Sequence, residues 1–201
     1  MTADNLHGTE PPSAWVQRWS HLVPARGAVL DVACGYGRHA RWFYERNHPV
    51  ALVDRAQAAI EFIANSLPAQ GVEAVVADIE EGPWPFAGRQ FDAVVVTNYL
   101  WRPLLPTLLA SLAPGAVLIY ETFTQGNETV GKPSRPDFLL RPGELLEVCR
   151  GLRVVAFEEG FEERSPRFVQ RIAAVRETAL SAGLSAPAAV AAEGPPRYRL
   201  A

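Results

Sequence analysis

The residues best suited to chemistry lie at positions 29–38, with the sequence VLDVACGYGR, where an apolar run containing one acid ends in a glycine-rich turn. Such an apolar run is typical of a strand buried on both faces. Gly35 and Gly37 allow the backbone to turn sharply and to approach a ligand closely. Amide groups at the start of the helix expected next can then face a polar group of that ligand. A lone G-x-G is a weak signal, but a position between a strand and a helix is the one that a cofactor-binding turn requires.

Two more carboxylates follow at the ends of the next two expected strands. Asp54 stands nineteen positions after Gly35, where a carboxylate can accept hydrogen bonds from both hydroxyls of a ribose. Asp78 can accept a hydrogen bond from an adenine amino group, while Ile79 offers a backbone N–H and an apolar wall. Taken singly, Asp31 fits a hydrogen-bonded strand residue, Asp54 a turn starter and Asp78 a helix cap. Three acids in this order are difficult to explain by chance.

The elements that must position these residues alternate between strands and helices. Strands are expected at residues 28–34, 50–53, 72–77, 91–96 and 116–122, and helices at 38–46, 57–67, 104–112 and 142–149. Two last strands, 154–159 and 168–175, are expected to form an antiparallel pair at the sheet edge. The repeated β-then-α units predict an α/β fold with a doubly wound, mostly parallel, Rossmann-like sheet that ends in this antiparallel pair.

A short amphipathic helix is expected before the sheet, with Ser13 as its N-cap and Trp15, Trp19 and Leu22 on one face. Two roles are open for the tryptophans, namely packing against the sheet or forming a lid over a ligand. We divide the chain into a tail and helix at 1–24, a cofactor-binding domain at 25–177 and an Ala/Pro-rich tail at 178–201.

Composition narrows the class of protein. The 201 residues suffice for one domain, with 48% hydrophobic and 20% charged residues and a net charge of −3. Because no basic tract is present, no DNA partner is expected. Cys34 and Cys149 form neither a disulfide framework nor a metal-ligand spacing, so no metal is expected. The lack of a signal peptide or a membrane-length apolar stretch predicts a cytoplasmic protein without a membrane partner. The oligomeric state is not predicted.

The run from residue 29 to residue 40 resembles motif I of class I S-adenosylmethionine-dependent methyltransferases, and the order of elements matches that family over roughly residues 25–176. The C-G-x-G-R form, with Asn98 and Tyr99 after the fourth strand, is similar to the branch of tellurite-resistance and ubiquinone-biosynthesis enzymes, methyltransferase types 11 and 12. The resemblance implies S-adenosylmethionine as cofactor and S-adenosylhomocysteine as product.

The resemblance also implies where the cofactor contacts the chain. Asp54 would contact the ribose, and Asp78 with Ile79 the adenine. Asn98 would approach the methionine amino group, and Arg55 is counted among the cofactor-binding residues. The residues expected around the methionine part are Asp31, Ala33, Gly35 and Gly37.

The main alternative is a nicotinamide dinucleotide site, because Gly35-x-Gly37-x-x-Ala40 also fits that fingerprint. Asp31 opposes this interpretation, since dinucleotide enzymes usually carry apolar residues inside the strand. The two late strands, with no sixth parallel unit, also resemble the end of the methyltransferase sheet.

Methyl transfer is an in-line displacement at a sulfonium carbon, so much of an enzyme's contribution is to hold the nucleophile ~3–3.5 Å from the methyl group. An oxygen or nitrogen nucleophile can also need a base. Tyr99 and Glu121, after the fourth and fifth strands, are the base candidates. Arg102 could orient an anionic substrate, cap a helix or pair with a surface acid. The substrate-binding candidates are Tyr99, Arg102, Phe123 and Asn127.

The loop at 124–137 is long and polar, which is typical of a functional loop, the alternative being a surface connection. Residues 97–100 lack the N-P-P-Y-type pattern of nucleobase amino-methyltransferases. Together with the acidic net charge, this favours a small polar molecule as methyl acceptor. The alternatives are a protein or tRNA target, or a non-catalytic S-adenosylmethionine-binding module. His39 and Cys34 are interpreted as packing residues rather than catalysts.

Overall fold

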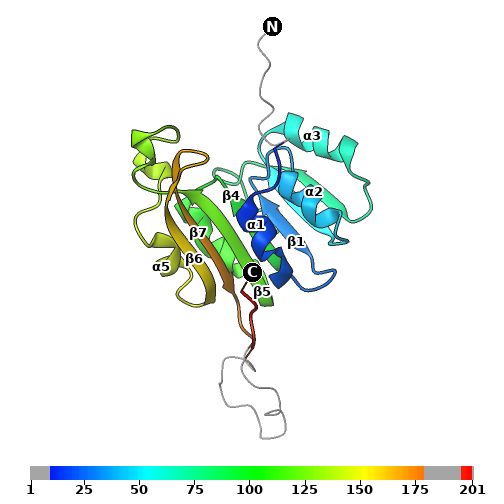
Figure 1. Cartoon of the computed structure of the whole chain (residues 1–201). Coiled ribbons are helices and arrows are strands. Elements are labelled where there is room, and N and C mark those ends of the chain that lie inside the picture. The colour runs from blue at the N-terminus through cyan, green and yellow to red at the C-terminus, as the bar shows by residue number, and fades with distance from the viewer. Residues whose placement is uncertain (1–9, 179–195, 201) are drawn as a thin grey trace, which may run out of the picture.

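The protein is described here by a computed structural model that places residues 10–178 and 196–200. Within these residues a single seven-stranded sheet has the order β3-β2-β1-β4-β5-β7-β6 (Figure 1). Its strands are β1 (Val29–Val32), β2 (Val50–Asp54), β3 (Val72–Val76), β4 (Phe91–Thr97), β5 (Leu112–Phe123), β6 (Arg153–Glu162) and β7 (Arg167–Val175).

The strands β1 to β5 are parallel to one another, whereas β7 runs antiparallel to both β5 and β6. The strand order reverses between β1 and β4, which are directly paired. In open α/β sheets, ligands bind beyond the carboxyl ends of the strands at such a reversal. The predicted fold class, a mostly parallel doubly wound sheet that ends in an antiparallel pair, is confirmed.

Helices cover both faces of the sheet (Figure 1). Because successive strand residues point to opposite faces, Leu30 and Val94 pack on one side, and Val29 and Val95 on the other. The helices are α1 (Ala14–Trp19), α2 (Arg38–Tyr44), α3 (Gln57–Ser66), α4 (Leu105–Ala110) and α5 (Glu144–Val148). Single 3₁₀ turns are η1 (Ser20–Leu22), η2 (Arg102–Leu104), η3 (Asn127–Thr129) and η4 (Pro136–Phe138).

The N-terminal helix α1 forms as expected, because the Ser13 side chain accepts a hydrogen bond from the amide of Trp15. Trp15 and Trp19 are 3% and 1% exposed, and both belong to the core between α1 and the sheet. The Trp15 ring nitrogen donates to the carbonyl of Ile172 in β7. Packing, rather than a lid, is therefore the role of these two tryptophans.

The boundary between α4 and β5 was predicted wrongly. The sequence favours a helix up to residue 112 and a turn at 113–115, but β5 begins at Leu112. Leu112 of β5 pairs with Phe91 of β4, and Val117 of β5 pairs with Ala93 of β4. The stretch of β5 between Leu112 and Val117 therefore contains more residues than the facing stretch of β4, which interrupts the regular pairing. Proline and glycine within a strand often mark such an irregularity, and here Gly115 has φ +85°.

The predicted boundaries 1–24, 25–177 and 178–201 stay a prediction, and most of the last segment lies outside the described residues. In the described part, Tyr198 packs against the core that contains α1, and the carbonyl of Arg199 contacts the His21 ring at 3.0 Å. None of the helices in residues 10–178 and 196–200 has the length and apolar character needed to span a membrane.

Candidate cofactor and acceptor site

The turn after β1 carries three residues with left-handed backbone, namely Ala33, Gly35 and Gly37, with φ of +52°, +53° and +72°. A side chain at Gly35 would meet no described protein atom within 4 Å, so this face of the turn is open to a ligand. A Cβ at Gly37 would instead lie 2.8 Å from Ile63 of α3. The two glycines thus serve different purposes, since Gly35 leaves space and Gly37 allows α2 and α3 to pack closely.

Asp54, at the end of β2, ties that strand to the glycine turn. One carboxylate oxygen accepts a hydrogen bond from the amide of Gly35 at 2.8 Å, and the other accepts one from the amide of Ala56 at 2.9 Å. Each oxygen has a second lone pair, so the carboxylate can accept ribose hydroxyls as well. The turn-starting role and the ligand-binding role are therefore compatible.

Asp78 has a similar arrangement after β3. One of its oxygens accepts hydrogen bonds from the amides of Glu80 and Glu81, at 2.9 and 3.2 Å. These bonds hold the pKa of the Asp78 carboxyl below its usual value. The cap expected from the sequence is present, and the carboxylate remains ionised and exposed beside Ile79.

A cavity of about 270 Å³ joins the ends of β1, β2 and β3, and we call it the β1–β3 pocket. It brings together six of the residues predicted from the sequence, namely Ala33, Asp54, Arg55, Asp78, Ile79 and Tyr99. Phe138 of η4 also lines it and was missed, although an aromatic residue directly after the long polar loop at 124–137 was a signal that could have identified it.

Asp31 lies beneath the turn rather than in the lining of this pocket. It is 1% exposed, and its carboxylate accepts a hydrogen bond from the amide of Ala40 in the first turn of α2, at 3.1 Å. Burial raises the pKa of Asp31 from 3.8 to about 7. Asp31 therefore fixes α2 against β1 and carries a proton that can be lost near neutral pH.

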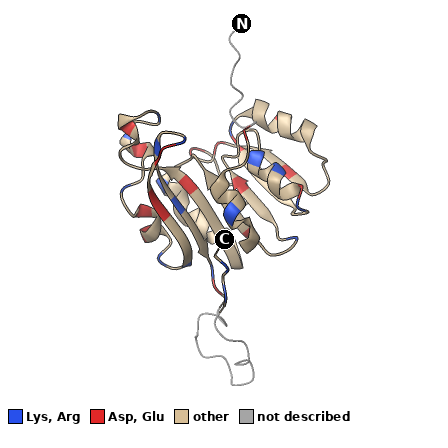
Figure 2. Ribbon diagram, viewed as in Figure 1, with Lys and Arg blue, Asp and Glu red and all other residues tan. Residues whose placement is uncertain are grey.

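A second cavity, of about 200 Å³, lies at the ends of β4, β5 and β7, and we call it the β4–β7 pocket. Asn98, Glu121, Arg167 and Arg171 line it, together with Glu10 and Arg38 from the N-terminal side. Asn98 has φ +54°, and its side-chain oxygen accepts a hydrogen bond from Arg167 at 3.4 Å. Figure 2 shows acidic and basic positions interleaved along β5, β6 and β7 in this region.

Glu121 is buried in the β4–β7 pocket within an ion-pair network. It lies 2.6 Å from Nε of Arg171 and 3.6 Å from Arg167, and it accepts a hydrogen bond from the Ser13 hydroxyl at 3.0 Å. Glu162 forms ion pairs with both arginines, at 2.6 Å from Nε of Arg167 and 2.7 Å from Nη2 of Arg171. A carboxylate held in this way has few lone pairs free for an acceptor's proton.

Tyr99 lies in the β1–β3 pocket, apart from Glu121. Its hydroxyl is buried and has no hydrogen-bond partner in the described part of the chain. Burial and the nearby Glu80 carboxylate raise the pKa of Tyr99, so the phenol stays protonated. The structure does not bring the two base candidates together, and Tyr99 is suited to donating a hydrogen bond to a ligand.

Three candidates for substrate binding lie outside both pockets. Arg102 donates to both oxygens of Glu144, at 2.7 and 2.9 Å, and to two carbonyls of the loop before α5. Asn127 is 2% exposed, and it donates to Pro133 and accepts from the amide of Phe168. Phe123 ends β5 without lining either pocket. Of the interpretations left open for Arg102, its contacts support pairing with an acid, but Glu144 is buried rather than a surface residue.

His39 and Cys34 are buried, as the packing interpretation predicted. The Ser13 amide donates to Nε2 of His39 at 3.1 Å, and burial with the charge of Arg38 lowers the pKa of His39 to about 3. Arg167 and Arg171 were missed, although their spacing of four along a strand places both on one face of the sheet.

Comparison with known proteins agrees with the α/β fold described above. The profile of a family described as a methyltransferase domain matches residues 29–115, and no curated protein sequence matches the chain. TehB from Haemophilus influenzae has 17% identity and a TM-score of 0.65, over 79% of this chain and 60% of TehB. This chain therefore spans about three fifths of the length of TehB.

Two further solved structures are similar in fold. An S-adenosylmethionine-dependent methyltransferase from Mesorhizobium loti has 17% identity and a TM-score of 0.65, over 82% of this chain and 99% of that one. The glycopeptide N-methyltransferase MtfA in complex with S-adenosylhomocysteine has 17% identity and a TM-score of 0.57, over 81% of this chain and 88% of its own.

Proposed function

We propose that this chain is a class I S-adenosylmethionine-dependent methyltransferase, and that it transfers the methyl group to a small polar molecule bound beside the β4–β7 pocket. The observation that carries this proposal is the position of that pocket at the carboxyl ends of β4 and β5. It adjoins the point where the strand order reverses, and it is small and lined mainly by polar side chains.

The residues of the β1–β3 pocket fit the cofactor. Asp54 and Asp78 offer carboxylate oxygens, Gly35 leaves its side of the turn open, and Ile79 and Phe138 supply apolar walls. A ribose and an adenine need this combination of acceptors and flat apolar surface. We therefore assign the adenosine part of the cofactor to this pocket and its methionine part to the region of Ala33 and Asn98.

When bound, S-adenosylmethionine supplies a methyl group on a positively charged sulfur. The chain's own residues hold the acceptor and exclude water. Asn98 and Arg167, linked by a hydrogen bond, shape the mouth of the β4–β7 pocket. Glu121 positions Arg171 and Ser13 through its buried ion pair and hydrogen bond, which makes the pocket rigid. A base role for Glu121 stays a prediction.

Charge distribution supports a small acceptor over tRNA. The net charge is −3, and Arg167 and Arg171 both lie within 4 Å of glutamate oxygens. A nucleic-acid footprint needs cations that are free to contact phosphates. A macromolecular acceptor such as a protein remains the second candidate, since MtfA, a solved structure of similar fold, is a glycopeptide N-methyltransferase.

The test is transfer of a labelled methyl group from the cofactor to a panel of metabolites, with tRNA and protein extracts assayed in parallel. Phenols, small acids, thiols and metalloid oxyanions belong in the panel. Turnover on a small molecule is expected, and the Gly35→Val variant serves as a control that should lose it. Turnover on macromolecules alone would reject the proposal. Cofactor binding without turnover on any of these acceptors would favour a non-catalytic binding module.

A further inference from the structure

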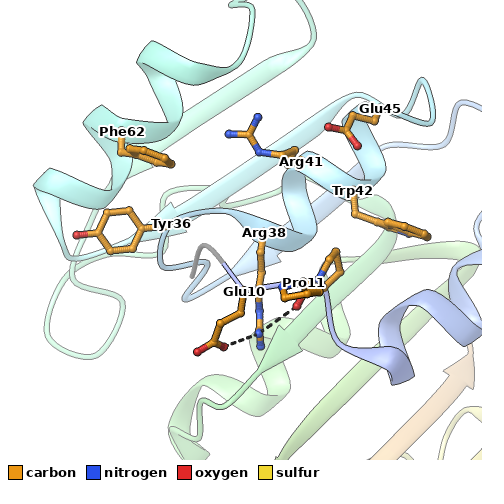
Figure 3. A pocket seen from close by; sticks show the side chains of 9 residues that line it. Glu10, Pro11, Tyr36, Arg38, Arg41, Trp42, Glu45 and Phe62 are labelled. Carbon is orange, nitrogen blue, oxygen red and sulfur yellow. Dashed lines mark hydrogen bonds and ion pairs between the residues drawn. The ribbon is translucent and has the colours of Figure 1, made fainter. Parts of the chain in front are cut away.

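A third cavity, of about 430 Å³, lies outside the two pockets assigned above (Figure 3). Its walls come from three segments that are separate in sequence: the N-terminal residues 10–12, the motif I turn with α2, and α3. Its volume falls in the range of pockets that enclose small organic ligands. We call it the α2–α3 pocket.

The walls of this pocket are mainly aromatic. Tyr36 and Phe62 meet edge to face, with ring centroids 5.4 Å apart and an interplanar angle of 77°. Trp42 of α2 lies across the pocket from them, and Pro11 closes the lower side (Figure 3). Phe62 is 38% exposed, so its ring is accessible to a ligand in the pocket. Flat rings on opposite sides favour a flat ligand between them.

The charged side chains of the pocket are Arg38, Arg41 and Glu45 of the α2 segment, together with Glu10. Arg38 is already paired with Glu10 at 3.1 Å and also donates to the carbonyl of Pro11. Arg41 donates to the Ser66 hydroxyl at 2.9 Å, and no carboxylate of residues 10–178 or 196–200 lies within ion-pair distance of it. Figure 3 shows the Arg41 guanidinium extending from α2 toward α3, with Phe62 on one side and Glu45 on the other. This cation can therefore pair with an anionic group of a ligand.

The α2–α3 pocket adjoins the β4–β7 pocket. Glu10 and Arg38 line both of them, so the Glu10–Arg38 ion pair forms the wall between the two. A ligand held in the α2–α3 pocket can extend past this wall toward Asn98 and Glu121. Within this ion pair the Glu10 side chain is 60% exposed and the Arg38 side chain is 15% exposed, so the wall faces solvent on its Glu10 side.

We infer that the α2–α3 pocket binds the ring of an aromatic acid, whose acid group pairs with Arg41 while its acceptor atom reaches the β4–β7 pocket. The inference rests on the proposed function and narrows its substrate class from a small polar molecule to an aromatic acid. The ring fits between Tyr36, Phe62 and Trp42, and the charge of Arg41 selects the acid over its neutral analogue.

The test measures binding directly, without turnover. The full chain is saturated with S-adenosylhomocysteine and titrated with para-fluorobenzoate, which is followed by fluorine NMR. Cyclohexanecarboxylate, which lacks the flat ring, and para-fluorobenzyl alcohol, which lacks the charge, serve as competing probes. We expect saturable binding of the aromatic acid and at least about tenfold weaker binding of each analogue, the effect of one lost contact of ordinary strength.

Two variants locate the binding. Phe62→Leu keeps an apolar side chain but removes the ring, and Arg41→Gln removes the charge, so each should weaken binding about tenfold. The matched controls are Phe161→Leu, at an exposed phenylalanine of β6, and Arg150→Gln, at an exposed arginine, and both should bind like the unchanged chain. Folding of every variant is checked by its thermal unfolding and its affinity for S-adenosylhomocysteine.

The turnover assay separates this inference from the proposed function. With an aromatic acid as acceptor, Phe62→Leu and Arg41→Gln should raise KM about tenfold and leave kcat nearly unchanged, because they remove binding contacts only. Absence of saturable binding, or binding that neither variant weakens, overturns the inference. Turnover on aliphatic acceptors alone overturns it as well and leaves the proposed function intact. Absence of turnover on every small molecule overturns both.

Discussion

The carboxylate of Asp31 accepts a hydrogen bond from the amide of Ala40 at 3.1 Å and so joins β1 to the first turn of α2. This bond holds the glycine turn between two rigid elements. The same carboxylate is completely buried, and burial raises its pKa to about 7. The residue that supports the cofactor turn is therefore costly to ionise, since a buried charge without a counter-ion destabilises the folded state.

Asp31→Asn tests this cost. Because the folded-state pKa of about 7 lies above the unfolded value of 3.8, the folded state binds this proton more tightly than the unfolded state. The resulting stability is fully present below pH 3.8 and is lost as pH rises through about 7. The loss corresponds to ~4 kcal/mol at most. The midpoint of thermal unfolding should therefore fall as pH rises from about 4 to about 7, and Asp31→Asn should lack that fall.

Asp92→Asn is the matched control, because Asp92 also accepts a hydrogen bond from a backbone amide, that of Ala28, at 2.7 Å. This variant leaves Asp31 in place and should retain the fall in the unfolding midpoint. An identical pH dependence for Asp31→Asn and the unchanged chain would contradict the assigned pKa.

The two glycines of the turn should respond differently to the same substitution. Gly35→Ala and Gly37→Ala both place a side chain at positive φ, at a cost of roughly 1–2 kcal/mol. Only at Gly37 does the new Cβ collide with Ile63, so Gly37→Ala should lower the unfolding midpoint more. Gly35→Ala should mainly weaken binding of S-adenosylhomocysteine, as measured by calorimetry.

The Ile63→Ala background separates the two causes of destabilisation at Gly37. In that background the collision is relieved, and Gly37→Ala should cost only the backbone strain. Equal costs of Gly37→Ala in both backgrounds would show that the 2.8 Å approach of Ile63 is not limiting.

Asp54→Ala should weaken binding of S-adenosylhomocysteine while the domain stays folded. Loss of hydrogen bonds to a charged acceptor costs ~1.5–3 kcal/mol. Asp54→Asn keeps one carbonyl acceptor and should bind with intermediate affinity. Titration calorimetry gives the affinities, and unchanged affinity in folded Asp54→Ala would limit Asp54 to its bonds with Gly35 and Ala56.

Tyr99→Phe distinguishes a base from a hydrogen-bond donor. The raised pKa of Tyr99 keeps the phenol protonated near neutral pH, so the hydroxyl can donate but does not remove a proton from the acceptor. Tyr99→Phe should therefore leave the pH profile of kcat unchanged. If Tyr99 is instead a general base, Tyr99→Phe should lower kcat by ~10²-fold or more, and the pH dependence of kcat should be lost.

The parts of the fold and site that the sequence predicted depend on short segments. The strand–turn–helix order around Gly35 and the acids at Asp54 and Asp78 each follow from residues within one β-then-α unit. Because the carboxyl ends of parallel strands meet at one edge, these separate signals lie together in the β1–β3 pocket. Their roles toward the cofactor stay predictions.

The parts that the sequence did not predict depend on contacts between distant segments. Glu121 looked like a free acid at a strand end, but its partner Arg171 is fifty positions away on β7. The bulge in β5 depends on its register with β4, which no local pattern specifies. Arg102 was predicted to bind substrate because it follows β4. Its actual partner, Glu144, lies on α5, and no local sequence pattern indicates that α5 packs beside Arg102.

Arg102→Ala tests whether that arginine is structural. Its partner Glu144 has a side chain only 5% exposed, whereas the Arg102 side chain is 34% exposed. Truncation leaves a buried carboxylate without its bidentate partner. Removing one partner of a fully buried ion pair lowers the free energy of unfolding by about 3–5 kcal/mol. At this partly exposed site the expected loss is about 2 kcal/mol. Arg102→Ala should therefore lower the unfolding midpoint and leave KM for the acceptor unchanged. Arg102→Ala combined with Glu144→Gln should recover part of the stability, because the uncompensated charge is gone. A raised KM with an unchanged unfolding midpoint would instead return Arg102 to the substrate site.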